Sequence, residues 1–369
     1  MITNKGLNPG PNLDELNAKA VDILNTSLGK LCARDSPTTV KLFKWTSHEI
    51  MLATTNAVYG PRNPFNNAAV QRFYYNYEAG LITLITGFLP SVFARASLKA
   101  RDVLVKAFLK YFSDSGLEEG SSVYAKNRYE YPSKLGVPIE DVARLEAGGS
   151  LGLIGNSMPA TFWTLYHAFS DPAILEDCRR EVSQAVHEKD GENHLDLSYV
   201  KSSCPILVST MQEAFRTHSM GISAREVMED HMLGGKYLLK NSPMAWGDDV
   251  NDFNHKRFVK EPGVRKYNPV AFRAFGGGAT LCPGRHFAST EILAFASVIM
   301  LRFDIKPLSA DGWNTAAYRE TNASFRVPNK DIDVQLIPRD NKKWHVFFSE
   351  PGRHMELSNE DIVAAKGAI

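Results

Sequence analysis

Apolar side chains recur along much of this chain at the spacing of one helix face. Between residues 13 and 31 they fall every three or four positions, after Pro11, which is a favourable first residue of a helix. The same spacing returns over residues 45–58, 68–87 and 96–112, with glycine and proline clusters between the segments. The N-terminal third is therefore predicted to be helical.

A longer helical stretch follows at residues 140–170, well beyond the usual length of about three turns. It contains Pro159, which has no N–H for the carbonyl of Gly155, so the helix should bend there and leave that carbonyl open. Two shorter helices are predicted next, over residues 171–189 and 203–217. A capping residue and a first-turn proline open each of them.

Strand character is confined to the second half of the chain. A hairpin is predicted at residues 232–239, around two adjacent glycines, with further strands at 334–337 and 345–348. No linker rich in proline, glycine or serine divides the sequence. The prediction is a single domain over residues 1–369, mainly α with a small β component.

Composition narrows the function classes. Lys and Arg number 42 against 41 Asp and Glu, without a block of either sign, so no nucleic-acid partner is expected. The most apolar run, residues 292–301, is too short to span a bilayer, and residues 1–12 lack a signal-like core. The chain as written is predicted to be soluble and cytoplasmic. Four scattered cysteines form neither a disulfide framework nor a zinc motif.

Candidate chemistry centres on Cys282, in a glycine-rich loop that precedes a strong helical pattern. A cysteine at a helix N-terminus lies at the positive end of the helix dipole, which favours its thiolate, and metal ligation needs a thiolate. Gly278 and Gly284 carry no Cβ and would let a flat macrocycle approach the backbone, while Phe275 could cover the sulfur. A buried free cysteine without chemistry is the plainer alternative.

The loop matches Phe-x-x-Gly-x-x-x-Cys-x-Gly, the haem-ligand signature of the cytochrome P-450 family, at Phe275, Gly278, Cys282 and Gly284. The chain therefore resembles a haem-thiolate monooxygenase with the cytochrome P-450 fold. The resemblance implies a haem cofactor, iron protoporphyrin IX, with Cys282 as axial metal ligand and the other three residues as cofactor-binding positions. Thr280 stands where many members carry a basic residue for a haem propionate.

Glu213 and Arg216 lie three apart on a predicted helix upstream of the cysteine loop, as the family's Glu-x-x-Arg does. Arg257 is the expected third partner. In the family this cluster is structural, whereas an isolated Glu-x-x-Arg is more often a solvated surface pair.

The long central helix carries the candidate catalytic residues Gly155 and Asn156, where the family usually has an acid and a threonine. Around Pro159 the sequence is similar to the branch of sterol 7α- and 12α-hydroxylases and prostacyclin synthase. That branch implies oxygen insertion into an apolar polycycle, such as a sterol, a terpenoid or another secondary metabolite, with electrons from an NADPH-dependent reductase. Because asparagine cannot supply an acidic proton, isomerisation of a peroxide substrate stays an alternative.

Two rival interpretations remain. Gly148-x-Ser150-x-Gly152 matches a hydrolase nucleophile elbow, but the residues before it are predicted to be helical where that motif needs a strand. The other rival is a non-catalytic truncated remnant. The resemblance begins near residue 13, and the family's membrane anchor, first strands and early helices have no counterpart here. Residues 240–246 suggest an internal gap. Full-length relatives are usually bound to the endoplasmic reticulum membrane. Because the early helix that grips a haem propionate is missing and Thr280 supplies no cation, weak haem retention is expected for the chain as written.

Overall fold

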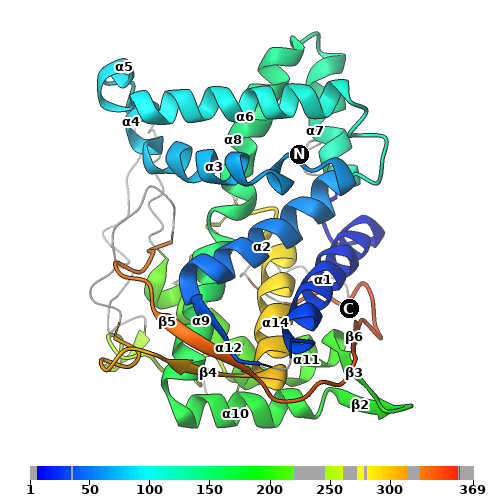
Figure 1. Cartoon of the computed structure of the whole chain (residues 1–369), viewed down its shortest axis with the longest axis vertical. Coiled ribbons are helices and arrows are strands. Elements are labelled where there is room, and N and C mark those ends of the chain that lie inside the picture. The colour runs from blue at the N-terminus through cyan, green and yellow to red at the C-terminus, as the bar shows by residue number, and fades with distance from the viewer. Residues whose placement is uncertain are drawn as a thin grey trace, which may run out of the picture.

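The structure, a computed structural model, describes residues 6–34, 36–219, 246–260, 272–277, 281–314, 325–355 and 357. The described part is mostly helical, with two small sheets beside the helices (Figure 1). This confirms the prediction of a mainly α chain with a small β component. The hairpin predicted at residues 232–239 lies outside the described residues.

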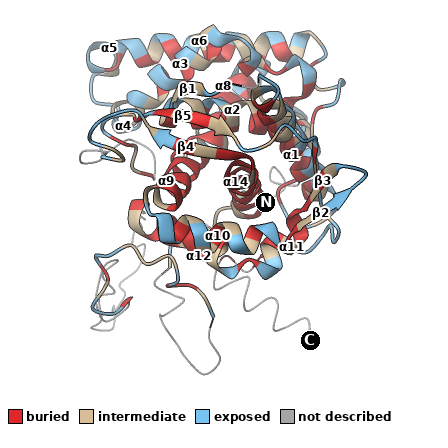
Figure 2. Ribbon diagram, turned by 60° about the horizontal axis from the view of Figure 1, so that its bottom comes forward, coloured by how far each residue is buried: buried red, intermediate tan, exposed pale blue. Residues whose placement is uncertain are grey.

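Two helices, α9 (Ser157–Ser170) and α14 (Arg285–Arg302), form the centre of the molecule and are almost wholly buried (Figure 2). The buried residues of α14 lie on every side of the helix, as expected for a helix enclosed by others. The helices packed against α9 besides α14 are α2 (Leu42–Tyr59), α10 (Pro172–Ser183) and α12 (Pro205–His218).

A buried carboxyl group joins α14 to α2. Thr54 Oγ1 donates a hydrogen bond to Glu291 Oε1 at 2.6 Å, and the other oxygen, Oε2, has no hydrogen-bond partner among the described residues. Because burial disfavours the charged form, the pKa of Glu291 is raised from 4.5 to about 8. Glu291 is therefore mostly protonated at neutral pH.

The first helices form where the apolar spacing predicts them. Helix α1 (Pro11–Cys32) begins directly after Gly10 and buries Leu13, Leu16, Leu24 and Leu28 on one face. That face packs against α2 and α14. Helix α2 covers the predicted segment 45–58 and extends it at both ends.

The upper part of Figure 1 is formed by α3 (Ala68–Ala79) and α6 (Arg95–Ser113), which pack side by side. The single helix predicted over residues 68–87 is wrong, because it divides at Gly80. A Cβ at residue 80 would lie only 2.1 Å from Ser97 Oγ, so glycine permits the close approach of α3 to α6. The short helices α4 (Leu81–Thr86) and α5 (Pro90–Phe93) follow α3. Helix α7 (Val123–Lys134) packs on α8 (Ile139–Ile154).

Helix α10 begins as predicted but ends early. The Asp171 carboxylate accepts a hydrogen bond from the Ala173 N–H at 2.8 Å and caps the helix. The helix ends at Ser183, six residues before the predicted end, because Val186–Lys189 pairs as strand β2. Tertiary pairing overrides the local helical pattern here.

The start of α12 is stabilised differently from the prediction. Cys204 occupies the N-cap without a side-chain capping bond. Instead, the Glu181 carboxylate of α10 accepts hydrogen bonds from the N–H groups of Ile206 and Leu207, at 2.8 and 3.2 Å. A residue more than twenty positions upstream thus supplies the cap.

Two three-stranded sheets flank the helices. In the first, β1 (Thr38–Lys41) and β4 (Phe303–Pro307) pair antiparallel on either side of β5 (Asp333–Pro338). In the second, β2 (Val186–Lys189) pairs antiparallel with β3 (Glu192–Asp196), and β6 (Trp344–Phe347) pairs parallel with β3. The predicted strands at 334–337 and 345–348 are confirmed as β5 and β6, apart from Phe348. Strands β1 to β4 were not predicted.

One connected cluster of buried apolar residues reaches from Leu7 to Leu357. A single domain over residues 1–369 stays a prediction. None of the described helices is both long and apolar enough to cross a membrane.

Candidate active site

Cys282 lies three residues before α14, in a loop that folds back on itself. Its backbone N–H donates to the Phe275 carbonyl oxygen at 2.9 Å, and Arg285 Nη1 donates to the Cys282 carbonyl oxygen at 3.1 Å. The Phe275 ring packs edge-on against Phe215 of α12, with ring centroids 5.3 Å apart. These contacts fix the cysteine at the entrance to the central helix.

The Cys282 side chain is partly buried, and its sulfur accepts hydrogen bonds from the backbone N–H groups of Gly284 and Arg285. Burial raises the pKa of the thiol above its ordinary value of 9.0, although the two N–H groups and the Arg285 charge lower it. For the thiol by itself, desolvation therefore exceeds the effect of the helix N-terminus. A metal cation would supply the missing compensation, since ligation displaces the thiol proton.

Gly284 stands directly beside this sulfur. A Cβ at residue 284 would lie 3.9 Å from Cys282 Sγ and 4.0 Å from Leu7 Cδ1, so any side chain there would fill the space next to the ligand atom. A lone thiol with N–H groups directed at its sulfur, beside a position without a side chain, fits a thiolate-bound haem. Gly278 and Thr280 lie outside the described residues.

The long helix predicted over residues 140–170 is two helices, α8 and α9, separated at Gly155 and Asn156. The Ala160 N–H bonds the Asn156 carbonyl at 3.1 Å, but Pro159 has no N–H to offer the carbonyl of Gly155. The predicted interruption is confirmed, and the Gly155 carbonyl lacks its helical bond.

Sequence reasoning missed two side chains of α3 that close over this interruption. A Cβ at Gly155 would lie 3.1 Å from Tyr74 Oη and 3.3 Å from Glu78 Oε1. The Tyr74 hydroxyl is buried without a hydrogen-bond partner among the described residues, and burial raises its pKa well above 10. The only sequence signal for the pair is its spacing of four, which places both side chains on one helix face.

The predicted Glu213, Arg216 and Arg257 are brought together in the core. The fully buried Glu213 carboxylate binds Arg216 through two bonds of 2.7 and 2.8 Å and Arg257 through one of 3.0 Å. Arg257 also bonds Asp249 at 2.8 Å and the Trp246 carbonyl at 3.0 Å. The cluster therefore ties α12 to residues 246–257. Of the segment 240–246, only Trp246 is described.

The hydrolase alternative fails on the position of its serine. Gly148, Ser150 and Gly152 all lie within helix α8, whereas a nucleophile elbow needs a strand before the serine. Ser150 Oγ is fully buried and donates to the Ala147 carbonyl at 2.7 Å.

Comparison with known proteins decides the family. A cytochrome P450 family model matches residues 155–335, which include both the helix interruption and the cysteine loop. Cytochrome P450 monooxygenase nodJ of Hypoxylon pulicicidum is 33% identical, over 92% of this chain and 72% of the relative. The chain belongs to the cytochrome P450 family. Members of this family hold haem through a cysteine thiolate, and the fungal relatives that match are named monooxygenases, which are oxidoreductases.

Other P450 relatives match over shorter stretches. Cytochrome P450 7A1 of Sus scrofa is 28% identical over 41% of this chain and 36% of the relative. The human 7-alpha-hydroxycholest-4-en-3-one 12-alpha-hydroxylase is 24% identical over 54% of this chain and 45% of the relative. The resemblance to the sterol 7α- and 12α-hydroxylases is confirmed, although the chain spans less than half the length of these two P450s.

The P450 fold is also shown by a solved structure. Cyanobacterial CYP120A1 bound to retinoic acid superposes with a TM-score of 0.66 at 17% identity, covering 88% of this chain and 75% of that chain. The likeness establishes the architecture of α9, α14 and their neighbours as that of a P450.

Proposed function

We propose that this chain is a haem-dependent monooxygenase that inserts one oxygen atom of dioxygen into an apolar polycyclic molecule. The observation that carries the proposal is the Cys282 thiol at the start of α14, with the N–H groups of Gly284 and Arg285 directed at its sulfur. When bound there, haem supplies the chemistry of oxygen activation. Cys282 would hold the haem iron through its sulfur, and the motif positions Phe275, Gly278 and Gly284 would line the cofactor.

The interruption of the central helix forms the oxygen side of the proposed site. The Gly155 carbonyl, left open by Pro159, accepts a hydrogen bond from an ordered water, and the Asn156 amide orients that water. Asparagine cannot release a proton at neutral pH, so the proton comes from the Glu78 carboxyl group, whose Oε1 reaches this point from α3. The Tyr74 hydroxyl, which also lies close to Gly155, is available to donate a hydrogen bond to the same water.

The names of the relatives support an apolar fused-ring molecule as the substrate. One of them, the human 7-alpha-hydroxycholest-4-en-3-one 12-alpha-hydroxylase, is named for a sterol-type substrate, and nodJ is a fungal monooxygenase. Several side chains near the helix interruption are apolar, including the buried Ile154, Met158 and Phe162. A sterol, a terpenoid or a comparable secondary metabolite would enter by burying its rings against such a surface.

The ferrous carbon monoxide spectrum tests the ligand. Purified chain supplied with haem should show the strongly red-shifted Soret band of thiolate ligation, and Cys282→Ala should lose it. Cys178→Ala is the matched control, because Cys178 is fully buried in α10 and should leave the band unchanged. Retention of the band in Cys282→Ala would refute the assignment.

The reaction class needs a second experiment. NADPH consumption coupled through a reductase to incorporation of labelled dioxygen into a sterol or terpenoid would establish the monooxygenase. Turnover of an organic peroxide without reductase, NADPH or label would instead establish an isomerase.

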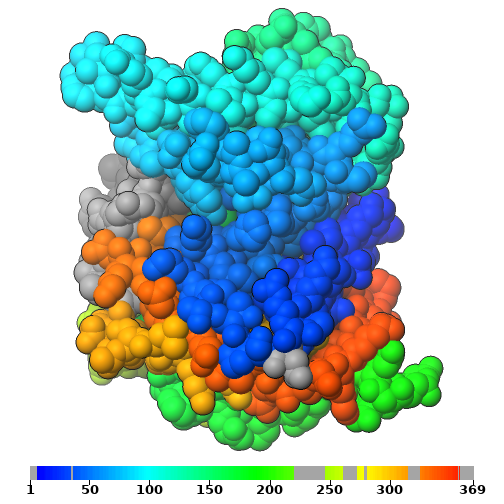
Figure 3. All heavy atoms as spheres, in the orientation of Figure 1, coloured from blue at the N-terminus to red at the C-terminus, as the bar shows by residue number. Residues whose placement is uncertain are grey.

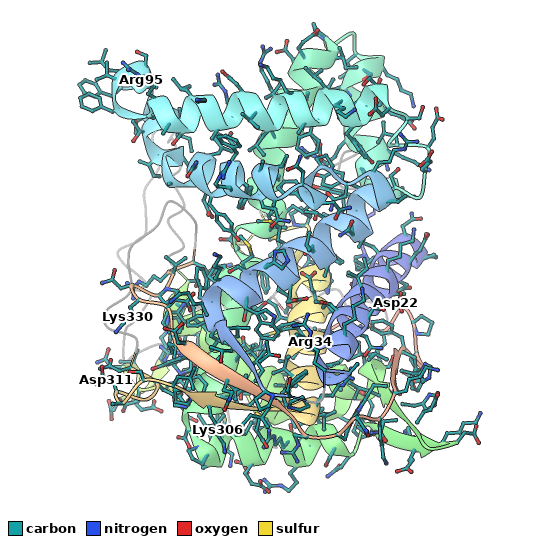
Figure 4. The ribbon with its side chains drawn as sticks, viewed as in Figure 1. Asp22, Arg34, Arg95, Lys306, Asp311 and Lys330 are labelled. Atoms are coloured by element: carbon teal, nitrogen blue, oxygen red, sulfur yellow. The ribbon has the colours of Figure 1, made fainter. Side chains whose placement is uncertain are left out.

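A membrane contact is proposed at the tip formed by α4 and α5. Helices α3 and α6 beside this tip turn buried faces to the protein. Five large apolar side chains of the tip are instead more than half exposed: Ile85, Phe88, Leu89, Val92 and Phe93. Figure 4 places the basic Arg95 at the same tip. An exposed apolar patch beside a cation fits the interface of an anionic bilayer.

Vesicle flotation tests this contact. Phe88→Ser with Phe93→Ser should reduce recovery with vesicles that contain anionic lipid. Leu135→Ser removes an equally exposed apolar side chain after α7 and should leave recovery unchanged. Equal recovery of the two variants with the vesicles would mean that the tip formed by α4 and α5 does not bind the membrane.

A further inference from the structure

Three side chains of the types that bind metal ions gather on the sheet formed by β2, β3 and β6. Glu192 and His194 are two residues apart on β3 and therefore point to the same face. His345 on β6 is the register partner of His194 across the parallel pair. One ligand atom from each of the three lies within 4.8 Å of the others. Figures 1 and 3 show these strands meeting at the lower right edge of the molecule.

The contacts within this cluster already bring nitrogen and oxygen ligands together. His345 Nε2 lies 2.5 Å from Glu192 Oε2, and the rings of His194 and His345 stack with centroids 4.7 Å apart and 18° between planes. Lys343 Nζ holds the other carboxylate oxygen, Oε1, at 3.1 Å. The His345 and Lys343 bonds lower the pKa of Glu192, so its carboxylate is charged at neutral pH. Solvent reaches the cluster, since about a third of the Glu192 side chain is exposed.

We propose that Glu192, His194 and His345 form a binding site for a divalent ion of the zinc class. Two imidazole nitrogens and one carboxylate oxygen are ligands that Zn²⁺ accepts, with a fourth position left for water, whereas Mg²⁺ and Ca²⁺ prefer all-oxygen sites. Bonds of about 2.0–2.2 Å place tetrahedral ligand atoms about 3.3 Å apart. That spacing lies between the present 2.5 Å contact and the 4.8 Å limit of the cluster, so the three ligand atoms are already close to the separation that the ion requires.

The ion would join two parts of the chain that are far apart in sequence. Strands β3 and β6 pair over only four residues each, and the cluster spans that pair. An ion shared by these residues would bind side chains of both strands at once. The bound ion would therefore hold β6 on β3 more firmly than the hydrogen-bonded pairing alone. None of the three residues belongs to the proposed haem site, so this inference stands apart from the proposed function.

Calorimetric titration of Zn²⁺ into the untagged full chain, loaded with haem and without it, tests the site. Wild type should bind saturably, and His345→Gln and Glu192→Gln should each weaken that binding by more than about tenfold. His48→Gln is the matched control, because His48 is exposed on α2 and bonded to Gln71, away from the cluster. Equal binding by wild type and His345→Gln, or a preference for Mg²⁺, would overturn the proposal.

Hydrogen exchange separates the joining role from adventitious binding. Zn²⁺ should slow amide exchange of residues 344–347 in wild type and in His48→Gln, but not in His345→Gln. Because the two variants fold without relying on the ion, their exchange in metal-free buffer should match wild type. Unchanged exchange in wild type with saturating Zn²⁺ would show that the ion does not hold β6.

Discussion

Replacing the buried Glu291 by glutamine should remove a large part of the pH dependence of stability. The pKa of Glu291 is about 8 in the folded chain, against an ordinary value of 4.5. Between those two pH values the unfolded chain releases this proton while the folded chain keeps it, so stability falls as pH rises. The gap of about 3.5 units corresponds to a loss of about 5 kcal/mol, complete above pH 8 and absent below pH 4.5.

The expected signal is the difference between two pH series. Glutamine has nearly the shape of glutamic acid and keeps an oxygen to accept the 2.6 Å bond from Thr54, but it does not titrate. Between pH 5.5 and pH 7.5 wild type should lose about 2–3 kcal/mol more than Glu291→Gln. Urea unfolding at each pH, followed by circular dichroism with a check of reversibility, measures this difference.

A second variant tests the direction in which Thr54 shifts the pKa of Glu291. The Thr54 hydroxyl lowers the pKa of Glu291, so Thr54→Val should raise it and extend the loss of stability above pH 8. Parallel pH curves for wild type and Glu291→Gln would refute the reasoning, because they would mean that the carboxyl group ionises equally in the folded and unfolded chain.

Three further predictions concern the candidate site. Arg257→Leu leaves the buried Glu213 with one cation and should lower the free energy of unfolding by about 3–5 kcal/mol, while an unchanged urea midpoint would contradict the structural role of the cluster. Pro159→Ala restores an N–H for the Gly155 carbonyl, so the free energy of unfolding should rise by up to about 3 kcal/mol. The variant should also consume more oxygen and NADPH for each molecule of product formed. An unaltered coupling ratio would argue against a role for the open carbonyl. Glu78→Gln removes the proton donor and should slow turnover and change its solvent isotope effect, with the carbon monoxide spectrum intact, whereas wild-type values of both would exclude the residue.

The helices of this chain were predictable where an apolar face is continuous. Helices α1, α2 and α6 follow their apolar spacing because each buries one face against neighbours. Strand β2 was assigned to the end of α10, because the four residues of Val186–Lys189 become a strand only through their partner β3. Strand β1 is equally short and pairs with residues almost three hundred positions later, which local patterns cannot show.

Some residues of the candidate site were likewise predictable from the sequence, and others were not. Cys282, Gly155 and the Glu213 cluster were found because each belongs to a motif of fixed spacing, and the structure brings Glu213, Arg216 and Arg257 into one network. Tyr74 and Glu78 carry no such motif, since their approach to Gly155 depends on how α3 crosses the interrupted helix. The raised pKa of the Cys282 thiol could not be predicted from the sequence either, because it depends on how far the folded chain removes the sulfur from water.

The pairing of β1 with β5 has a consequence for how the chain is made. Lys41 bonds Asp333 across the strand pair, a separation of 292 residues. Strand β3 also pairs with a strand, β6, that is synthesised much later. At about 5–20 residues per second, a ribosome needs roughly 15–60 s to synthesise β5 after β1, and roughly half as long to synthesise β6 after β3. During that interval the edges of β1 and β3 are open to other nascent chains, and long-range pairing closes them slowly. Expression at reduced temperature or with added chaperones should therefore increase the yield of folded protein. Substitutions that stabilise the helices should increase it less.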